Sequence, residues 1–170
     1  MSHSEFTIQN SQFKIAWLLT GSAALLLSPR GLVALVHYET SPVGPYDEWA
    51  RIVFTRSGPR VVDMAVTSEE SMHAGRANWG FPKRLAKLSW KRSGARLEFW
   101  TESENYRLRL RGPRLPMRAK FFCVQTLEGR EVRVPLKSSG QARIAWRGRQ
   151  IALLIEDFVF EVNPPVPPDG

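Results

Sequence analysis

The feature that most constrains the fold is the regular recurrence of strand-length segments separated by turns. Two apolar segments flank a turn at residues 28–31, and a second turn occupies residues 56–59. Residues 106–111 alternate strictly between Tyr or Leu and Arg, which is typical of a half-buried strand with a basic outer face. Short strands with frequent turns favour an antiparallel β sandwich or barrel. The expected strands cover residues 23–27, 32–38, 46–54, 60–66, 86–91, 96–101, 106–111, 121–126, 131–135, 142–147 and 150–162.

One segment has the signals of a helix. Thr67 is followed three residues later by Glu70, which is the spacing of a capping box. Gly75 is typical of the residue that ends a helix. We therefore expect a short helix over residues 68–74.

The composition is that of a folded chain with few cysteines and histidines. With 170 residues and 43% hydrophobic residues, we expect a single domain, flanked by a polar arm (1–12) and a proline-rich, mobile tail (163–170). Cys123 is the only cysteine, which excludes an intramolecular disulfide and a cysteine zinc cluster. The three histidines give little support to a metal site. We expect a cytoplasmic protein with neither a metal nor an organic cofactor.

The charge balance permits anionic partners. The net charge is +8 and the isoelectric point is about 10.2. The arginines are spread over many segments, so we interpret most of them as a solvated surface. The apolar run at residues 15–27 is too short to span a membrane, and we expect no membrane partner.

The stretch from residue 75 to residue 84 carries the most distinctive chemistry. Lys83 follows Phe81 and a proline, and Arg84 comes directly after it. Burial and a neighbouring cation both disfavour the charged form of an amine. A neutral lysine could attack a ketone or aldehyde and form a Schiff base. The alternative is an ordinary surface lysine after a turn.

Other residues could complete such a site. Glu48 shares a predicted strand face with Tyr46 and could transfer protons. Arg76 could bind a substrate carboxylate, or it could cap helix carbonyls or pair with a nearby glutamate. Trp79 and Phe81 could line a pocket, or they could belong to the core.

These residues together resemble the signature of the acetoacetate decarboxylase family. Gly75 and Arg76, four variable residues, and then Phe81-Pro82-Lys83-Arg84 are similar to that family's Gly-Arg, four residues, aromatic-Pro-Lys-Lys. Its Tyr-x-Glu motif is matched by Tyr46 and Glu48, and its Trp-x-Leu-x-Gly segment by residues 17–21.

The resemblance implies both a fold and a reaction. The fold is a mainly β, antiparallel conical barrel or double sheet with one or two short helices, which assembles into homo-oligomers. Lys83 is implied as the Schiff-base lysine and Glu48 as an active-site acid, with Arg84 in place of the second lysine. The implied activity is that of a carbon–carbon lyase on a small keto acid or ketone, with the substrate contacted by Arg84, Arg76, Tyr46, Trp79 and Phe81.

Two departures from the family pattern leave the reaction open. A second acidic residue is expected on the strand before the Tyr-x-Glu motif, and counting without gaps places Val33 there. An arginine near the substrate carboxylate has no counterpart before Trp17, where Lys14 is the only cation. Decarboxylation, another imine reaction such as aldol condensation or dehydration, and no reaction at all are each compatible with these changes.

Two functions other than catalysis compete with the lyase hypothesis. The first is a small-ligand binder that keeps the family pocket without turnover. The second, which we favour least, is a nucleic-acid-binding β module that uses a basic strand. Its residues would be Arg107, Arg109, Arg111 and Arg114, with Tyr106.

Overall fold

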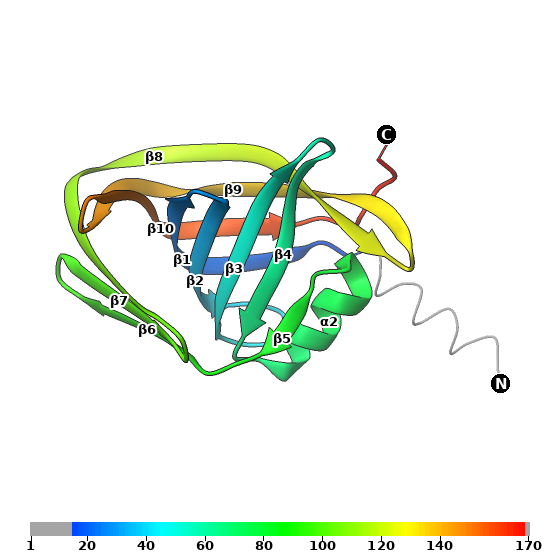
Figure 1. The fold of residues 1–170 in the computed structure, drawn as a ribbon, viewed down its shortest axis with the longest axis horizontal. Coiled ribbons are helices and arrows are strands. Elements are labelled where there is room, and N and C mark those ends of the chain that lie inside the picture. The colour runs from blue at the N-terminus through cyan, green and yellow to red at the C-terminus, as the bar shows by residue number, and fades with distance from the viewer. Residues whose placement is uncertain (1–14, 169–170) are drawn as a thin grey trace.

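The computed structural model describes residues 15–168, and these residues form one large sheet with a single helix (Figure 1). The sheet has ten strands in the order β5-β4-β3-β2-β1-β10-β9-β8-β7-β6. Neighbouring strands are antiparallel except β4 and β5, which are parallel. The strands are β1 (Trp17–Ser28), β2 (Gly31–Thr40), β3 (Tyr46–Thr55), β4 (Gly58–Val66), β5 (Lys83–Leu85), β6 (Leu88–Ser93), β7 (Arg96–Thr101), β8 (Asn105–Leu127), β9 (Arg130–Arg147) and β10 (Gln150–Val162).

The mainly β prediction is confirmed, with two differences in detail. The sheet curls but is not hydrogen-bonded into a closed barrel, since β5 and β6 are its two edges. The short parallel strand β5 was not predicted. Its three residues follow a proline and present one buried residue, so no alternating pattern marks them as a strand.

The longest strands run through sequences that predict turns. β8 continues past Gly112, and the extra residues are taken up by a register shift between Arg111 and Leu115. β9 likewise unites the two strands expected at 131–135 and 142–147. The predicted end of the β8 strand at Arg111 is wrong because a bulge can absorb a Gly-Pro pair within a continuous ladder.

Two apolar cores lie on opposite faces of the central strands. On β1, Leu19 and Ala23 belong to the first core, whereas Ala24 and Leu26 belong to the second. Because β1 is buried on both faces, its sequence is a nearly continuous apolar run rather than an alternating one. The first core also holds a residue of α2, the end of β8 and the start of β9, and the second is covered by β7 and the start of β8.

The helix α2 (Glu69–Trp79) is longer than predicted at its C-terminal end. Its N-cap is Ser68, whose Oγ accepts the backbone N–H of Ser71 at 3.1 Å. Thr67, the predicted N-cap, instead accepts the N–H of Asp47 at 3.0 Å. Gly80 ends the helix in the left-handed conformation, at φ 69°, so the predicted end at Gly75 is wrong.

The beginning of the C-terminal tail is attached to β9. The N–H of Asn163 donates to the carbonyl of Pro135 at 3.0 Å, and Val166 forms an isolated bridge with Arg133. Trp79 donates its indole N–H to the Asn163 carbonyl at 2.9 Å. The predicted arm at 1–12 lies outside the described residues. In the described range, no helix has both the length and the hydropathy that a membrane span requires.

Candidate active site

Lys83 is a buried lysine whose amine contacts two polar groups from other elements. Its side chain is 7% exposed, and Nζ lies 3.2 Å from Oε2 of Glu48 on β3. Nζ also donates to Oγ of Ser71 on α2, at 2.9 Å. Glu48 and Ser71 are themselves buried. The structure therefore brings Lys83 and Glu48 into one ion pair inside the first core.

The sheet order explains how residues so far apart in the chain meet. β3 pairs with β4, and β4 pairs with β5, so β3 and β5 lie two strands apart. Glu48 is opposite Val66 on β4, and Lys83 is opposite Met64. Since side chains alternate across a sheet, both residues point to the face that packs against α2.

Two buried tyrosines surround the same carboxylate. Tyr38 on β2 donates its hydroxyl to Oε1 of Glu48 at 3.2 Å. The Tyr46 ring lies 4.6 Å from the Tyr38 ring and 5.4 Å from Lys83 Nζ. Burial, followed by the nearby Glu48 charge, raises the pKa of both tyrosines well above its usual value. Both hydroxyls therefore keep their protons near neutral pH.

Sequence reasoning missed Tyr38 and Ser71. Tyr38 could have been found from the alternation of β2, where Ala34, Val36 and Tyr38 face the first core. Ser71 lies three residues after the N-cap, on the buried side of the helix. No short motif marks either residue, since their roles depend on how β2 and α2 pack.

Val33 does not face the site. It packs against the second core, whereas Val36 is the β2 residue opposite Glu48. The count without gaps chose the wrong face of the strand, because neighbouring strand residues point to opposite sides. The first-core residues of β2 are Ala34, Val36 and Tyr38, so this strand offers a hydroxyl rather than a second carboxylate.

The two predicted arginines are not brought to the amine of Lys83. Arg84 alternates to the exposed side of β5 and pairs with Asp63 at 3.1 Å. Arg76 is exposed and donates from Nε to the backbone carbonyl of Lys83 at 2.6 Å. Arg76 therefore holds the β5 backbone in place, and Arg84 lies on the surface.

Trp79 and Phe81 are buried in the first core, with ring centroids 6.1 Å apart. Tyr38 and Tyr46 belong to the same core. The aromatic residues that precede Lys83 thus help to enclose the region from which its amine reaches Glu48.

Comparisons with known proteins identify one family. The family model described as acetoacetate decarboxylase (ADC) matches residues 18–109, a range that includes Tyr38, Glu48, Ser71 and Lys83. A comparison with curated protein sequences finds no match.

Two solved structures resemble the fold. One is acetoacetate decarboxylase (ADC) from Legionella pneumophila subsp. pneumophila str. Philadelphia 1, with a TM-score of 0.54 and 12% identity over 90% of this chain and 84% of that one. The other comes from structural studies of acetoacetate decarboxylase, with a TM-score of 0.42 and 10% identity over 90% of this chain and 86% of that one. At these identities, the first match supports the fold.

Proposed function

Because this chain belongs to the acetoacetate decarboxylase family, we propose that Lys83 forms a Schiff base with a small keto acid or ketone. The observation that carries the proposal is the position of the Lys83 amine. It is buried, 3.2 Å from the carboxylate of Glu48 and 2.9 Å from the hydroxyl of Ser71. A lysine kept from water beside a proton acceptor is suited to nucleophilic catalysis.

The first step requires a neutral amine. Glu48 can take a proton from Lys83, since the two groups are already in contact. The nitrogen then bonds to the carbonyl carbon of the substrate, and the carbonyl oxygen leaves as water after it has gained two protons. Tyr38 donates its hydroxyl to the same carboxylate and keeps its own proton, so it orients Glu48 for these proton transfers.

The protonated imine would then withdraw electrons from the adjacent carbon–carbon bond. With a β-keto acid, the electrons of the bond to the carboxylate move toward the imine nitrogen and carbon dioxide is released. The resulting enamine takes a proton at carbon, and water hydrolyses the imine to free Lys83. Glu48 is the nearest carboxylate that can carry these protons.

The contacts of Lys83 with Glu48 and Ser71 also support a second function, non-catalytic ligand binding. The Lys83 amine already has two partners, and a buried ion pair of this kind also serves to fix the packing of β3 and β5. In that case the region around Lys83 would bind a carbonyl compound without forming a covalent bond.

Borohydride trapping distinguishes the two functions. The protein is incubated with acetoacetate or with acetone, reduced, and analysed by peptide mass spectrometry. Reduction before decarboxylation leaves a 3-aminobutyrate adduct on the Lys83 nitrogen, whereas reduction afterwards leaves an isopropyl adduct. Lys83→Met should abolish the adduct. The matched control Lys87→Met, at an exposed residue four positions away, should leave it unchanged. Ligand-dependent thermal stabilisation without any adduct would support the non-catalytic role and contradict the lyase.

A further inference from the structure

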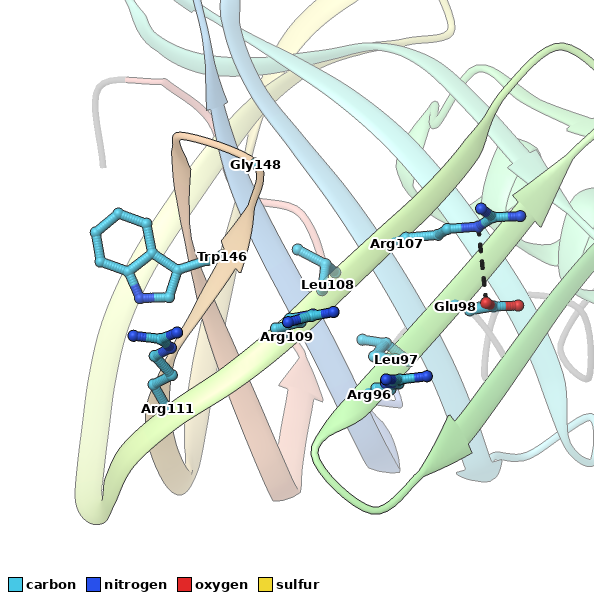
Figure 2. A pocket seen from close by; sticks show the side chains of 9 residues that line it. All are labelled: Arg96, Leu97, Glu98, Arg107, Leu108, Arg109, Arg111, Trp146 and Gly148. Atoms are coloured by element: carbon cyan, nitrogen blue, oxygen red, sulfur yellow. Dashed lines mark ion pairs between the residues drawn. The ribbon is translucent and has the colours of Figure 1, made fainter.

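A basic hollow lies on the outer face of β7, β8 and β9, apart from Lys83. It is a cavity of about 730 Å³ open to solvent, and Figure 2 shows its side chains on neighbouring strands. Four arginines, one glutamate and a tryptophan contribute side chains. The lining residues are Arg96, Leu97, Glu98, Arg107, Leu108, Arg109, Arg111, Trp146 and Gly148.

The strand register places like charges directly opposite each other. Arg96 on β7 pairs with Arg109 on β8, which in turn pairs with Trp146 on β9. Like charges at directly opposed positions destabilise a sheet. Within residues 15–168, no acidic side chain forms an ion pair with Arg96, Arg109 or Arg111. An anionic ligand would relieve this repulsion.

The one acidic residue in the hollow offers little compensation. Glu98 lies 3.7 Å from Arg107, and their side chains are 51% and 75% exposed. Exposed pairs of this kind contribute little to stability and are easily exchanged for another partner. Arg107 is therefore also accessible to a ligand anion.

The hollow differs from the basic set that the sequence suggested. Tyr106 is buried and accepts the indole N–H of Trp49 at 3.0 Å, so it faces the interior. Arg114 is paired with Glu156 and Asp157 beyond the bend of β8. The hollow instead includes Arg96 and Trp146. The sequence could not place these two residues beside β8, because that requires knowing that β7 and β9 pair with it.

We propose that this hollow binds single-stranded nucleic acid. Arg107, Arg109 and Arg111 form a row along β8 with about 7 Å between successive members. A row of cations at that spacing can follow the phosphates of an extended strand, and the half-exposed indole of Trp146 offers a surface on which a base can stack. The guanidinium groups are spread over two strands rather than converging on one point, which suits an extended polyanion better than a small anion. The inference does not depend on the proposed lyase activity.

The test measures fluorescence anisotropy of a labelled, mixed-sequence single-stranded oligonucleotide over a range of salt concentrations. The triple variant Arg96→Gln, Arg109→Gln, Arg111→Gln should bind at least about 10-fold more weakly at low salt. Its plot of log K against log salt should be shallower by about 2, because each lost phosphate contact removes about 0.7 from the slope. Trp146→Ala should weaken binding about 10-fold with little change in slope, since stacking releases no counterions.

A control variant removes the same charge from another region. Arg118→Gln, Lys120→Gln, Arg130→Gln changes three exposed cations outside the hollow and should keep most of the affinity. Equal losses in both triple variants would show that only net charge matters and would overturn the site. Binding to phosphatidylserine-containing vesicles with none to the oligonucleotide would overturn the choice of ligand.

Discussion

The side chain of Lys83 packs directly against the backbone of Gly75. A Cβ atom on residue 75 would lie 2.5 Å from Lys83 Cδ and 2.7 Å from Cε. The far end of the lysine is held by Ser71 and Glu48, so the side chain has little freedom to move aside. The glycine in the middle of α2 is therefore required by the lysine it faces.

We expect Gly75→Ala to displace the Lys83 amine from Glu48. Alanine in a helix normally gains about 1 kcal/mol over glycine. Overpacking against Lys83 should cost about 1–3 kcal/mol, so the variant should be no more stable than the parent. Urea unfolding measures this, and borohydride trapping should show adduct formation slowed at least about 10-fold.

Ala77→Gly serves as the control for this variant. Residue 77 is exposed on the same helix, so the change should cost about 1 kcal/mol without slowing adduct formation. If Gly75→Ala instead stabilised the protein and left trapping intact, the contact between Gly75 and Lys83 would not matter.

The ion pair between Lys83 and Glu48 should show strong coupling in a double-mutant cycle. Lys83→Met leaves a buried carboxylate without its cation, and Glu48→Gln leaves a buried ammonium without its anion. Each single change should lower the free energy of unfolding by about 3–5 kcal/mol, and the double variant should cost much less than the sum. Urea titrations of the four proteins give the coupling energy.

An exposed pair provides the comparison. Arg84 and Asp63 are 3.1 Å apart, with side chains 53% and 33% exposed. The cycle of Arg84→Met and Asp63→Asn should give a coupling of at most about 1 kcal/mol. Similar coupling in the two cycles would mean that burial of the Lys83 pair has no energetic consequence.

Local patterns predicted most of the strands but not how long they are or how they pair in the sheet. β7 and β10 fall where alternation and apolar runs placed them. The continuity of β8 through Gly112 could not be predicted, because pairing with β9 stabilises a bulge that a local pattern interprets as a turn. Because β1 is buried on both faces, its sequence is an apolar run without alternation. Such a run does not show which of the two cores each residue packs against.

The candidate site was predictable only where its residues lie in a short motif. Lys83 and Glu48 were identified from their local sequence, and Tyr46 from the resemblance to the family motif, and the three do lie together. Tyr38 and Ser71 were not, because their contacts depend on the β2–β3 register and on the position of α2. The prediction that Arg84 lies in the site rested on its position directly after Lys83. Neighbouring residues of a strand point to opposite faces, so Arg84 lies on the exposed face of β5.

Arg76 should affect the reaction by holding Lys83 rather than by binding substrate. Its Nε donates to the Lys83 carbonyl at 2.6 Å, so Arg76→Gln loosens the backbone of β5. We expect adduct formation at saturating keto acid to slow about 10-fold, with the half-saturating concentration unchanged. Arg84→Gln, which removes an exposed arginine nearby, should change neither value. A raised half-saturating concentration with an unchanged maximal rate would show instead that Arg76 binds the substrate carboxylate.

Cys123 should make the stability of the protein fall at alkaline pH. Burial raises the pKa of the Cys123 thiol from 9.0 to about 12. Between these values the folded protein keeps the thiol proton and the unfolded chain releases it, so raising the pH favours unfolding. The contribution of the buried, protonated thiol to the free energy of unfolding is fully present below about pH 9. It is lost progressively toward pH 12, at about 1.4 kcal/mol per pH unit. Cys123→Ala lacks this contribution, so its stability deficit relative to the parent should shrink as the pH rises above 9, as measured by urea unfolding. Parallel pH profiles for the two proteins, or rapid reaction of the folded thiol with a thiol reagent, would contradict a buried, protonated Cys123.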